Sequence, residues 1–317
     1  IDYAQNEGIA STLCSYHKNF IGGVDSGVLP KAAMSVTTSM ICDGNINTFR
    51  HMEQKHQVES YVLDIPNTYS PEAERYVVGQ LQELIELLET KTGQMLDMNE
   101  LQAAIQRENE SKEYYKAFLK EQKHRYYPNT MTLDLYMLFA SHLNIGTQET
   151  LDFFKCLAED VKTYPEFNGK GILWVHLMPY YQETLQQYMN YQEKYYIQAC
   201  DLNLDYMEPL NAAHPLEALA KKMILNIYNG PYERKVEMIR HLVKDFQSDA
   251  VIHFCHWGCK QSSGGVMLLK EAMREENVPM LILDGDALDR RNSHDGQIKT
   301  RLQAFLELID NIEEDKD

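Results

Sequence analysis

Residues 171–178 read Gly-Ile-Leu-Trp-Val-His-Leu-Met and lie between Asn168-Gly169 and Pro179. A short, continuous apolar run between turn residues is typical of a strand that is buried on both faces of a parallel sheet. Three further runs of this kind follow along the chain, at residues 195–200, 250–254 and 279–283. The stretch therefore predicts the first strand of an α/β domain.

Helical patterns separate and follow these strands, and they cover residues 183–193, 216–228, 232–246, 263–276 and 296–312. Strands that alternate with helices predict a doubly wound parallel sheet. The first half of the chain is richer in helix, with long patterns at residues 71–92, 99–124 and 131–161, the last one broken near Gly146. Its β-branched or apolar runs at residues 35–41 and 60–65 predict a smaller sheet of the same kind.

We expect an α/β protein with two Rossmann-like, flavodoxin-like domains, in which helices flank parallel sheets and the first domain carries additional helices. A chain of 317 residues with 44% hydrophobic residues is long enough to bury two cores. The turn-rich stretch at residues 164–169 indicates the boundary. Residues 1–168 are then the N-terminal lobe, and residues 169–317 are the C-terminal doubly wound domain.

Charge and hydropathy narrow the class of protein. The net charge is −17, and no run of basic residues stands out, so nucleic acid and anionic membranes are disfavoured as partners. No apolar run approaches the roughly 20 residues that span a bilayer, and the first residues lack the pattern of a signal peptide. Six cysteines are too sparse for a secreted disulfide scaffold, so we expect a soluble cytoplasmic protein with reduced thiols.

Cysteines occur where predicted strands end. Cys42 follows the run at residues 35–41, and both Cys255 and Cys259 follow the run at residues 250–254. Ligands of an open α/β sheet collect at the carboxyl ends of its strands. Cys14 precedes two glycines that could turn the chain toward the same crevice. Spacing alone leaves burial as a hydrophobic residue open for each of these cysteines.

Two other cysteines and three histidines carry weaker signals. The pattern around Cys156 places it on the apolar face of a helix, so we expect it in the core, whereas Cys200 ends a strand and could line a site. The histidines that lie near cysteines are candidate acids or bases, but a histidine more often satisfies a local hydrogen bond. These candidates are His17, His253 and His256, and we assign a catalytic role to none of them.

Four segments together resemble the 2-hydroxyacyl-CoA dehydratase and benzoyl-CoA reductase family. They are Cys14-Ser-Tyr-His-Lys with its trailing glycines, Cys42-Asp-Gly-Asn-Ile-Asn with Phe49-Arg50, His256-Trp-Gly-Cys-Lys-Gln-Ser262, and the helix that begins Gly296-Gln-Ile-Lys-Thr-Arg301. The block at residues 253–307 is the most specific part, and the resemblance covers nearly the whole chain. Members of the family usually carry a further stretch ahead of the first cysteine, where this sequence has thirteen residues.

The resemblance implies three cysteine ligands for a [4Fe-4S] cluster, bound by the N-terminal lobe together with the second domain. They map to Cys14, Cys42 and Cys259, and Cys255 is the alternative third ligand. Three thiolates would leave one iron open to a substrate oxygen, where it can act as a Lewis acid.

The resemblance also implies the reaction, in which an (R)-2-hydroxyacyl-CoA is converted to a 2-enoyl-CoA in anaerobic metabolism. One electron added to the thioester carbonyl gives a ketyl radical anion, which expels the α-hydroxyl and makes the β-hydrogen acidic. The family takes that electron from a separate ATP-dependent iron–sulfur activator, and this chain has no P-loop pattern of its own. A homologous second dehydratase subunit and an acyl-CoA substrate complete the expected partners.

Residues near the third cysteine are candidates for binding the thioester in a crevice between the two domains. The segment Ser262-Ser263-Gly264 could offer backbone amides at a helix start, and Lys260 and Arg301 could attract the CoA phosphates. Alternatives remain open: a benzoyl-CoA-type or double-cubane-cluster reductase subunit, a non-catalytic electron-relay subunit, or an α/β scaffold without metal. The Trp257-Gly258-Cys259-Lys260 loop favours a dehydratase.

Overall fold

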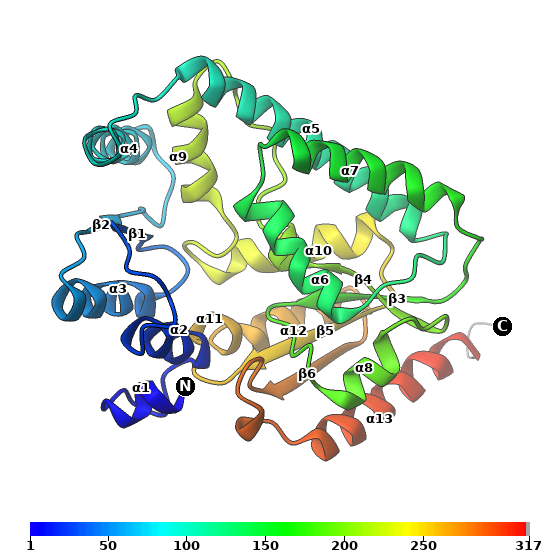
Figure 1. The fold of residues 1–317 in the computed structure, drawn as a ribbon. Coiled ribbons are helices and arrows are strands. Elements are labelled where there is room, and N and C mark those ends of the chain that lie inside the picture. The colour runs from blue at the N-terminus through cyan, green and yellow to red at the C-terminus, as the bar shows by residue number, and fades with distance from the viewer. Residues whose placement is uncertain (315–317) are drawn as a thin grey trace. The chain divides into compact units, whose positions relative to one another are not determined.

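The computed structural model describes residues 1–314 and shows a mixed α/β protein whose parallel sheets are flanked by helices (Figure 1). The chain forms two compact units. Unit 1 contains Ile1–Gln106 and Glu208–Arg234, and unit 2 contains Arg107–Met207 and Lys235–Asp317. The division into domains at residues 1–168 and 169–317 stays a prediction, and residues 315–317 of the second domain lie outside the described ones.

Unit 1 is built around a small parallel sheet of two strands, β1 (Ser35–Thr38) and β2 (Ser60–Leu63). Its helices are α1 (Asp2–Asn6), α2 (Ser15–Asp25), α3 (Asp43–His56), α4 (Pro71–Thr92) and α9 (Pro215–Leu225). Although α9 comes from late in the chain, its Ala220 and Ile224 share a core with Leu63 and Val77. This packing explains why residues 208–234 belong to unit 1.

Helix α4 shows how local sequence sets the bounds of an element. The Ser70 hydroxyl accepts a hydrogen bond from the Ala73 amide, and Pro71 occupies the first turn, where a missing N–H costs nothing. Gly93 ends the helix in the left-handed conformation that glycine adopts most readily. The helix predicted at residues 71–92 is therefore confirmed at both ends.

Unit 2 contains a four-stranded parallel sheet with the order β4-β3-β5-β6. The strands are β3 (Lys170–Val175), β4 (Tyr195–Cys200), β5 (Ala250–His256) and β6 (Met280–Gly285). All residues of β4 and β5 are buried, as expected for strands that read as continuous apolar runs. The four strands predicted in this half of the chain are confirmed.

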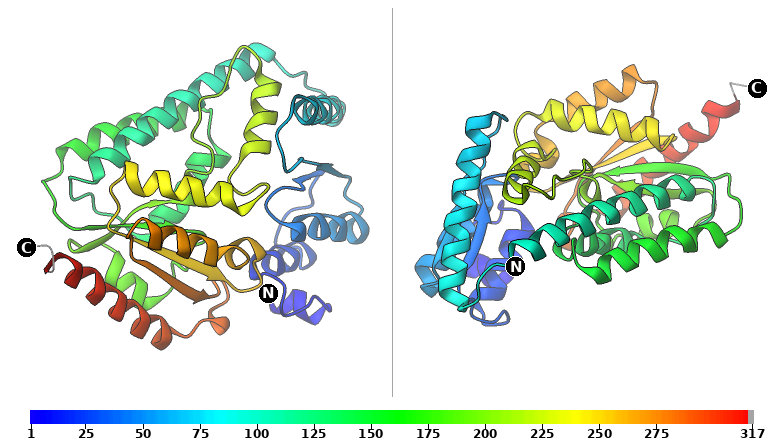
Figure 2. Two further views of the ribbon diagram at one scale, coloured as in Figure 1. Left: turned by 180° about the vertical axis from the view of Figure 1, so that it is seen from behind. Right: turned by 90° about the horizontal axis from the view of Figure 1, so that it is seen from above.

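Helices lie along both faces of this sheet (Figure 2). Helices α8 (Glu183–Met189) and α13 (Asp295–Glu314) contact each other, and Arg240 of α10 (Tyr232–Asp245) pairs with Glu275 and Glu276 at the end of α12 (Val266–Glu275). The remaining helices are α5 (Met98–Gln122), whose residues up to Gln106 belong to unit 1, and α6 (Met131–Leu138), α7 (Gln148–Asp160) and the short α11 (Lys260–Ser263) of unit 2. Short helical turns η1 (Phe139–Leu143), η2 (Val161–Thr163), η3 (Asp201–Asn203) and η4 (Arg290–Asn292) complete the elements.

The break predicted near Gly146 in the helical pattern at residues 131–161 is confirmed: α6 passes into the π-helical turn η1, and the chain leaves the helix at Gly146, whose φ is +89°, before α7 begins. Two other sequence-based expectations were wrong. Cys156 is exposed, since the buried face of α7 carries Leu151, Phe154 and Leu157 instead. Gly22 and Gly23 do not turn the chain: both lie inside α2, where the small Gly22 lets α2 approach Ala4 of α1.

A buried carboxyl on α6 predicts a pH-dependent stability. Oδ1 of Asp134 accepts a hydrogen bond from Asn129, but Oδ2 is buried without a hydrogen-bond partner among the described residues. Burial raises the pKa of Asp134 to about 7. The folded protein then keeps a proton between about pH 4 and pH 7 that the unfolded chain has released, so this group lowers stability as the pH rises through that window.

Asp134→Asn is therefore expected to be more stable than the wild type at pH 8, and the advantage should shrink by roughly 1 kcal/mol per pH unit toward pH 4. Urea unfolding of both proteins at a series of pH values measures the difference. The same substitution at the exposed Asp152 of α7 is the control, with an expected effect below about 0.5 kcal/mol. A constant difference between Asp134→Asn and wild type across this pH range would contradict the argument.

Candidate functional site

In unit 1, Cys42 lies at the start of α3 and contacts a histidine of α2. Its sulfur accepts a hydrogen bond from the Gly44 amide at 3.3 Å, so the thiol caps the helix. The Nε2 atom of His17 lies 3.5 Å from the same sulfur, and Nδ1 of His17 lies 2.9 Å from the Thr48 hydroxyl. Burial lowers the pKa of His17, so its ring is neutral near pH 7. The Cys42 sulfur thus lies within reach of the Gly44 N–H group and of one ring nitrogen of His17.

Cys14 occupies the equivalent position at the neighbouring helix, because it is the N-cap residue of α2. Its side chain is buried, whereas Cys42 is half-buried. His17 is in the first turn of α2, so the contact from His17 to Cys42 ties the first turns of the two helices together. Helix N-termini carry partial positive charge, which favours a thiolate over a thiol.

The backbone beside Cys42 is strained. Ile41 has φ of +70°, in the left-handed region that β-branched residues rarely adopt. Strain of this kind costs of order 1–3 kcal/mol and is concentrated at functional positions. Here it turns the chain from β1 into α3 so that Cys42 becomes the helix cap.

Gly44 provides the space in which His17 and Cys42 meet. A Cβ at Gly44 would lie 2.7 Å from Nε2 of His17 and 3.2 Å from the Cys42 sulfur. We expect Gly44→Ala to displace His17 and to lower the free energy of unfolding by about 1–3 kcal/mol, as overpacking does. Urea unfolding checks this, together with the rate at which iodoacetamide alkylates Cys42.

Gly79 of α4 is the matched control, because a Cβ there would meet no atom within 4 Å. Gly79→Ala should raise stability by up to about 1 kcal/mol through helix propensity. If Gly44→Ala stabilised the protein as much as Gly79→Ala does, His17 would not be packed as the structure places it.

In unit 2, two thiols lie at the carboxyl end of strand β5: Cys255 is the second-last residue of the strand, which is longer than the run predicted at residues 250–254, and Cys259 follows the strand. Cys259 is half-buried, and its sulfur lies 3.6 Å from Nε2 of His176. Cys255 is buried; it donates a long hydrogen bond to the Ser262 carbonyl and lies 3.7 Å from Nδ1 of His253. Burial raises the pKa of the Cys255 thiol to about 11. Cys259 is accordingly the more accessible of the two sulfurs.

A buried ion pair lies behind His176. Nζ of Lys235 is 2.9 Å from Oδ2 of Asp201, and the two side chains are 1% and 0% exposed. The other carboxylate oxygen, Oδ1, accepts a hydrogen bond of 2.6 Å from the His176 amide. His176 itself has φ of +76°, and burial followed by the charge of Lys235 lowers its pKa well below the ordinary value. The ion pair thus holds a strained histidine against Cys259.

Two other histidines, His256 and His253, lie at this edge of the sheet and are packed within the protein. Nδ1 of His256 accepts a hydrogen bond from the Ala287 amide at 2.9 Å, which fixes its ring. His253 stacks on His176 with ring centroids 6.3 Å apart, and its buried Nε2 has no hydrogen-bond partner among the described residues. Burial lowers the pKa of His253 to about 3, so it is neutral near pH 7. The sequence did not single out His176, although this histidine lies within the apolar run at residues 171–178 that predicted β3 and directly follows the strand.

The predicted substrate-binding residues lie in or near the same loop, and their role stays a prediction. Ser262 is fully buried, and its hydroxyl accepts a hydrogen bond from the His256 amide. Ser263 donates to the Cys259 carbonyl, and Gly264 ends α11. Lys260 is exposed, while Arg301 pairs with Asp284 at 3.0 Å.

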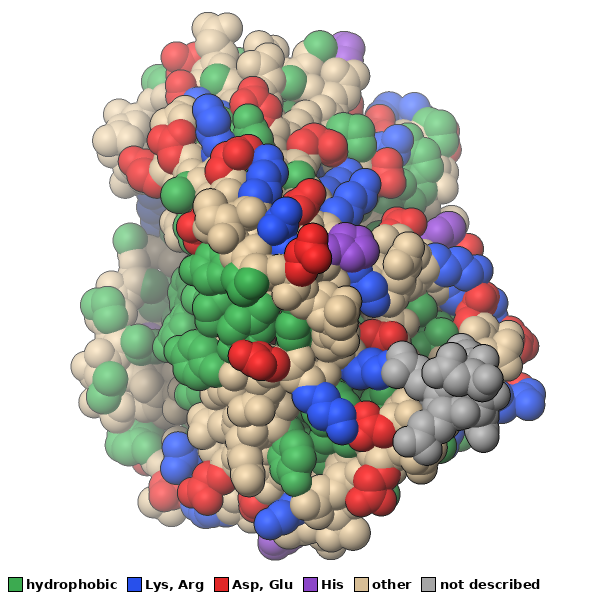
Figure 3. All heavy atoms as spheres, turned by 90° about the vertical axis from the view of Figure 1, so that its right-hand side faces the viewer, with side chains coloured by type: hydrophobic (Ala, Val, Ile, Leu, Met, Phe, Trp, Pro, Cys, Tyr) green, Lys and Arg blue, Asp and Glu red, His purple; other side chains and the backbone are tan. Residues whose placement is uncertain are grey.

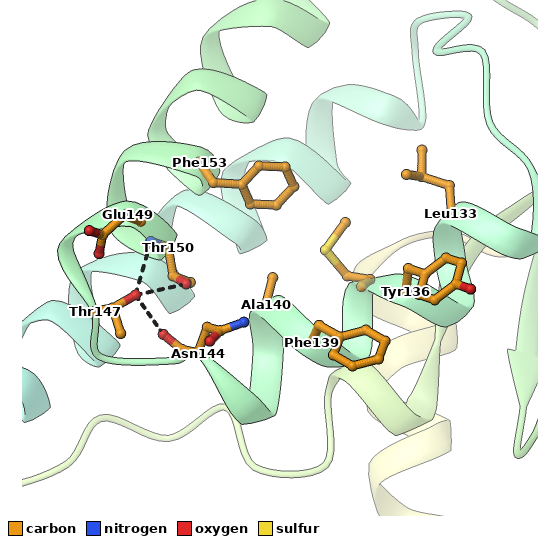
Figure 4. Close-up of a pocket in the computed structure, with 10 residues that line it drawn as sticks. Leu133, Tyr136, Phe139, Ala140, Asn144, Thr147, Glu149, Thr150 and Phe153 are labelled. Atoms are coloured by element: carbon orange, nitrogen blue, oxygen red, sulfur yellow. Dashed lines mark hydrogen bonds between the residues drawn. The ribbon is translucent and has the colours of Figure 1, made fainter. Parts of the chain in front are cut away.

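A separate pocket of about 560 Å³ lies between α6, η1 and α7 in unit 2. Its apolar wall includes Leu133, Phe139 and Phe153, and its polar end is closed by hydrogen bonds of Thr147 to Asn144 and Thr150 (Figure 4). None of the predicted site residues lines it. Hydrophobic side chains also form one broad area on the face shown in Figure 3.

The thiols fit an iron–sulfur cluster in their chemistry, because all six cysteines are reduced and thiolates are the ordinary ligands of such clusters. Cys14 and Cys42 belong to unit 1, and Cys255 and Cys259 belong to unit 2. Within the part of the chain that the structure describes, no three His, Cys, Asp or Glu side chains are grouped to hold a metal ion. The three-cysteine ligand set therefore stays a prediction.

Comparison with known proteins identifies the class. The family model of the 2-hydroxyglutaryl-CoA dehydratase D-component matches residues 1–309, so the chain belongs to this family of dehydratases, which are lyases. The expected dehydratase family is thereby confirmed. Among residues 1–314, no helix is both long and apolar enough to cross a membrane.

Three curated relatives are named as dehydratase alpha subunits. The (R)-phenyllactyl-CoA dehydratase alpha subunit of Clostridium sporogenes is 25% identical over 97% of this chain and 79% of its own length. The lactoyl-CoA dehydratase subunit alpha of Anaerotignum propionicum is 20% identical over 98% of this chain and 81% of its own length. A third, the (R)-2-hydroxyisocaproyl-CoA dehydratase alpha subunit of Clostridioides difficile, is 22% identical over 98% of this chain and 80% of its own length.

Proposed function

We propose that this chain is one subunit of an (R)-2-hydroxyacyl-CoA dehydratase that removes water from its substrate to give the 2-enoyl-CoA. The observation that carries the proposal is the family match over residues 1–309. The named relatives act on phenyllactyl, lactoyl and 2-hydroxyisocaproyl thioesters, which share the 2-hydroxyacyl group and differ in the rest of the acyl chain. The shared group defines the proposed substrate class.

Cys14, Cys42 and Cys259 are the proposed ligands of a [4Fe-4S] cluster, which would supply a single electron at low potential. Cys14 and Cys42 are the N-cap residues of two helices, and the Cys42 sulfur accepts a capping hydrogen bond from Gly44; helix N-termini favour anionic groups. Cys259 is preferred to Cys255 because it is half-buried in the loop after β5, whereas Cys255 is buried within the strand. His17 and Gly44 orient Cys42, and His176 lies against Cys259.

The proposed enzyme is a heteromer. The relatives are named as alpha subunits, which supports a second, homologous subunit, and an ATP-dependent iron–sulfur activator would deliver the electron in the cytoplasm. Residues Lys260, Ser262, Ser263, Gly264 and Arg301 are proposed to bind the CoA thioester. The Rossmann-like character of two domains, divided at residue 168, is part of the same proposal.

The test is an anaerobic assay of the complete complex. The chain, its partner subunit and the activator are mixed with ATP and a reductant, and then with (R)-2-hydroxyacyl-CoA thioesters that have aromatic, branched or short acyl groups. Formation of the enoyl-CoA from at least one thioester is expected. If no thioester is dehydrated while benzoyl-CoA is reduced, the dehydratase assignment is wrong and the reductase alternative replaces it.

A further inference from the structure

We propose that His17 and His176 are positioning residues that donate hydrogen bonds to the sulfurs of Cys42 and Cys259 and so set the reduction potential of the cluster. The inference rests on the proposed function, since it assumes that these two sulfurs are cluster ligands. It adds two residues for which the family match alone gives no role.

The same contact occurs in each unit. In unit 1, Nε2 of His17 is 3.5 Å from the Cys42 sulfur, and in unit 2, Nε2 of His176 is 3.6 Å from the Cys259 sulfur. Both distances are within hydrogen-bonding range for sulfur. Each contact joins separate elements: His17 is in α2 and Cys42 caps α3, while His176 follows β3 and Cys259 follows β5. Neither pair is a consequence of closeness in sequence.

The ring of His17 is oriented by a second partner. The Thr48 hydroxyl is buried and lies 2.9 Å from Nδ1 of His17, and a hydroxyl can either donate or accept there. In the proposed arrangement Thr48 donates to Nδ1, so that the ring proton of His17 lies on Nε2 and faces the Cys42 sulfur. Partners that fix the tautomer of a histidine in this way are common around metal sites.

His176 is oriented through its backbone. Its φ of +76° is unfavourable for a side chain of this size, and the 2.6 Å hydrogen bond from its amide to Asp201 holds it there. Asp201 is in turn fixed by the buried Lys235. A strained residue that is held by a buried ion pair indicates a required position, and in that position Nε2 meets Cys259.

Hydrogen bonds to cluster sulfurs favour the reduced state, which carries more negative charge, and so raise the reduction potential. Removing either donor should make the cluster harder to reduce while leaving its iron in place. Two donors would ease a reduction that takes place at very low potential. The proposed effect of the two histidines is electronic. A merely structural role would leave the reduction potential of the cluster unchanged, so the potential distinguishes the two roles.

The experiment is an anaerobic redox titration of the reconstituted complex, followed by electron paramagnetic resonance. We expect His17→Ala and His176→Ala to keep the wild-type iron content and to shift the midpoint potential to more negative values. His17→Gln and His176→Gln retain an N–H donor and should return toward the wild-type potential. His241→Ala, which alters an exposed histidine of α10, is the control with no shift.

Two outcomes overturn the inference. If the alanine variants hold their iron and titrate at the wild-type potential, the histidines do not tune the cluster, while the proposed function stands. If the wild-type complex binds no iron after reconstitution, the proposed function fails and the inference fails with it. Loss of iron in the alanine variants with retention in the glutamine variants would support the contacts, provided that the glutamine variants also titrate near wild type.

Discussion

Replacing Cys259 by serine is expected to remove most of the iron from the reconstituted complex and to lower the dehydration rate by at least ~100-fold. Loss of a residue that only hydrogen-bonds to a metal ligand typically costs about 10–100-fold, and loss of a ligand itself should cost more. Cys14→Ser and Cys42→Ser should behave alike. Cys255→Ser should keep the iron, since Cys255 is buried within β5. Anaerobic iron and sulfide analysis, together with the rate of enoyl-CoA formation, measures both effects.

Cys156→Ser is the matched control, because Cys156 is exposed on α7 and takes no part in the proposed ligand set. It should retain both iron and activity. The reverse result at β5, with iron lost in Cys255→Ser and retained in Cys259→Ser, would make Cys255 the third ligand. Full iron in all three predicted ligand variants would refute the cluster assignment.

Breaking the ion pair of Asp201 and Lys235 should have the largest effect on stability. Lys235→Met leaves a carboxylate buried without its cation, which costs about 3–5 kcal/mol. Both side chains are almost inaccessible to water, at 0% and 1% exposure, so solvent cannot replace the lost partner. Urea unfolding of the apo-protein under reducing conditions measures the loss.

The double variant Asp201→Asn/Lys235→Met removes the uncompensated charge and should recover part of the lost stability. Lys194→Met tests an exposed pair for comparison. Nζ of Lys194 is 2.6 Å from Asp310, but its side chain is 65% exposed, so the expected change is below about 1 kcal/mol. Equal losses in Lys235→Met and Lys194→Met would contradict the dominant role of burial.

Much of the fold could be predicted because the signals are local. Continuous apolar runs marked the strands of unit 2, and Ser70, Pro71 and Gly93 marked the ends of α4. The break near Gly146 was predicted, but the π-helical turn at Phe139–Leu143 was not, since nothing in its composition separates it from an α-helical turn. The exposure of Cys156 likewise depends on which face of α7 packs, and not on the residue itself.

The thiols could be proposed from sequence because cysteines after strands, in segments that resemble a known family, are a local pattern. The sequence by itself determined the parallel α/β class, the family and the cysteines of interest. Only the tertiary structure decided that His17 meets Cys42 and His176 meets Cys259, because these contacts join residues 25 and 83 positions apart. It also decided that Asp201 and Lys235 form a pair, since a buried ion pair depends on two elements coming together and leaves no signal in either element alone.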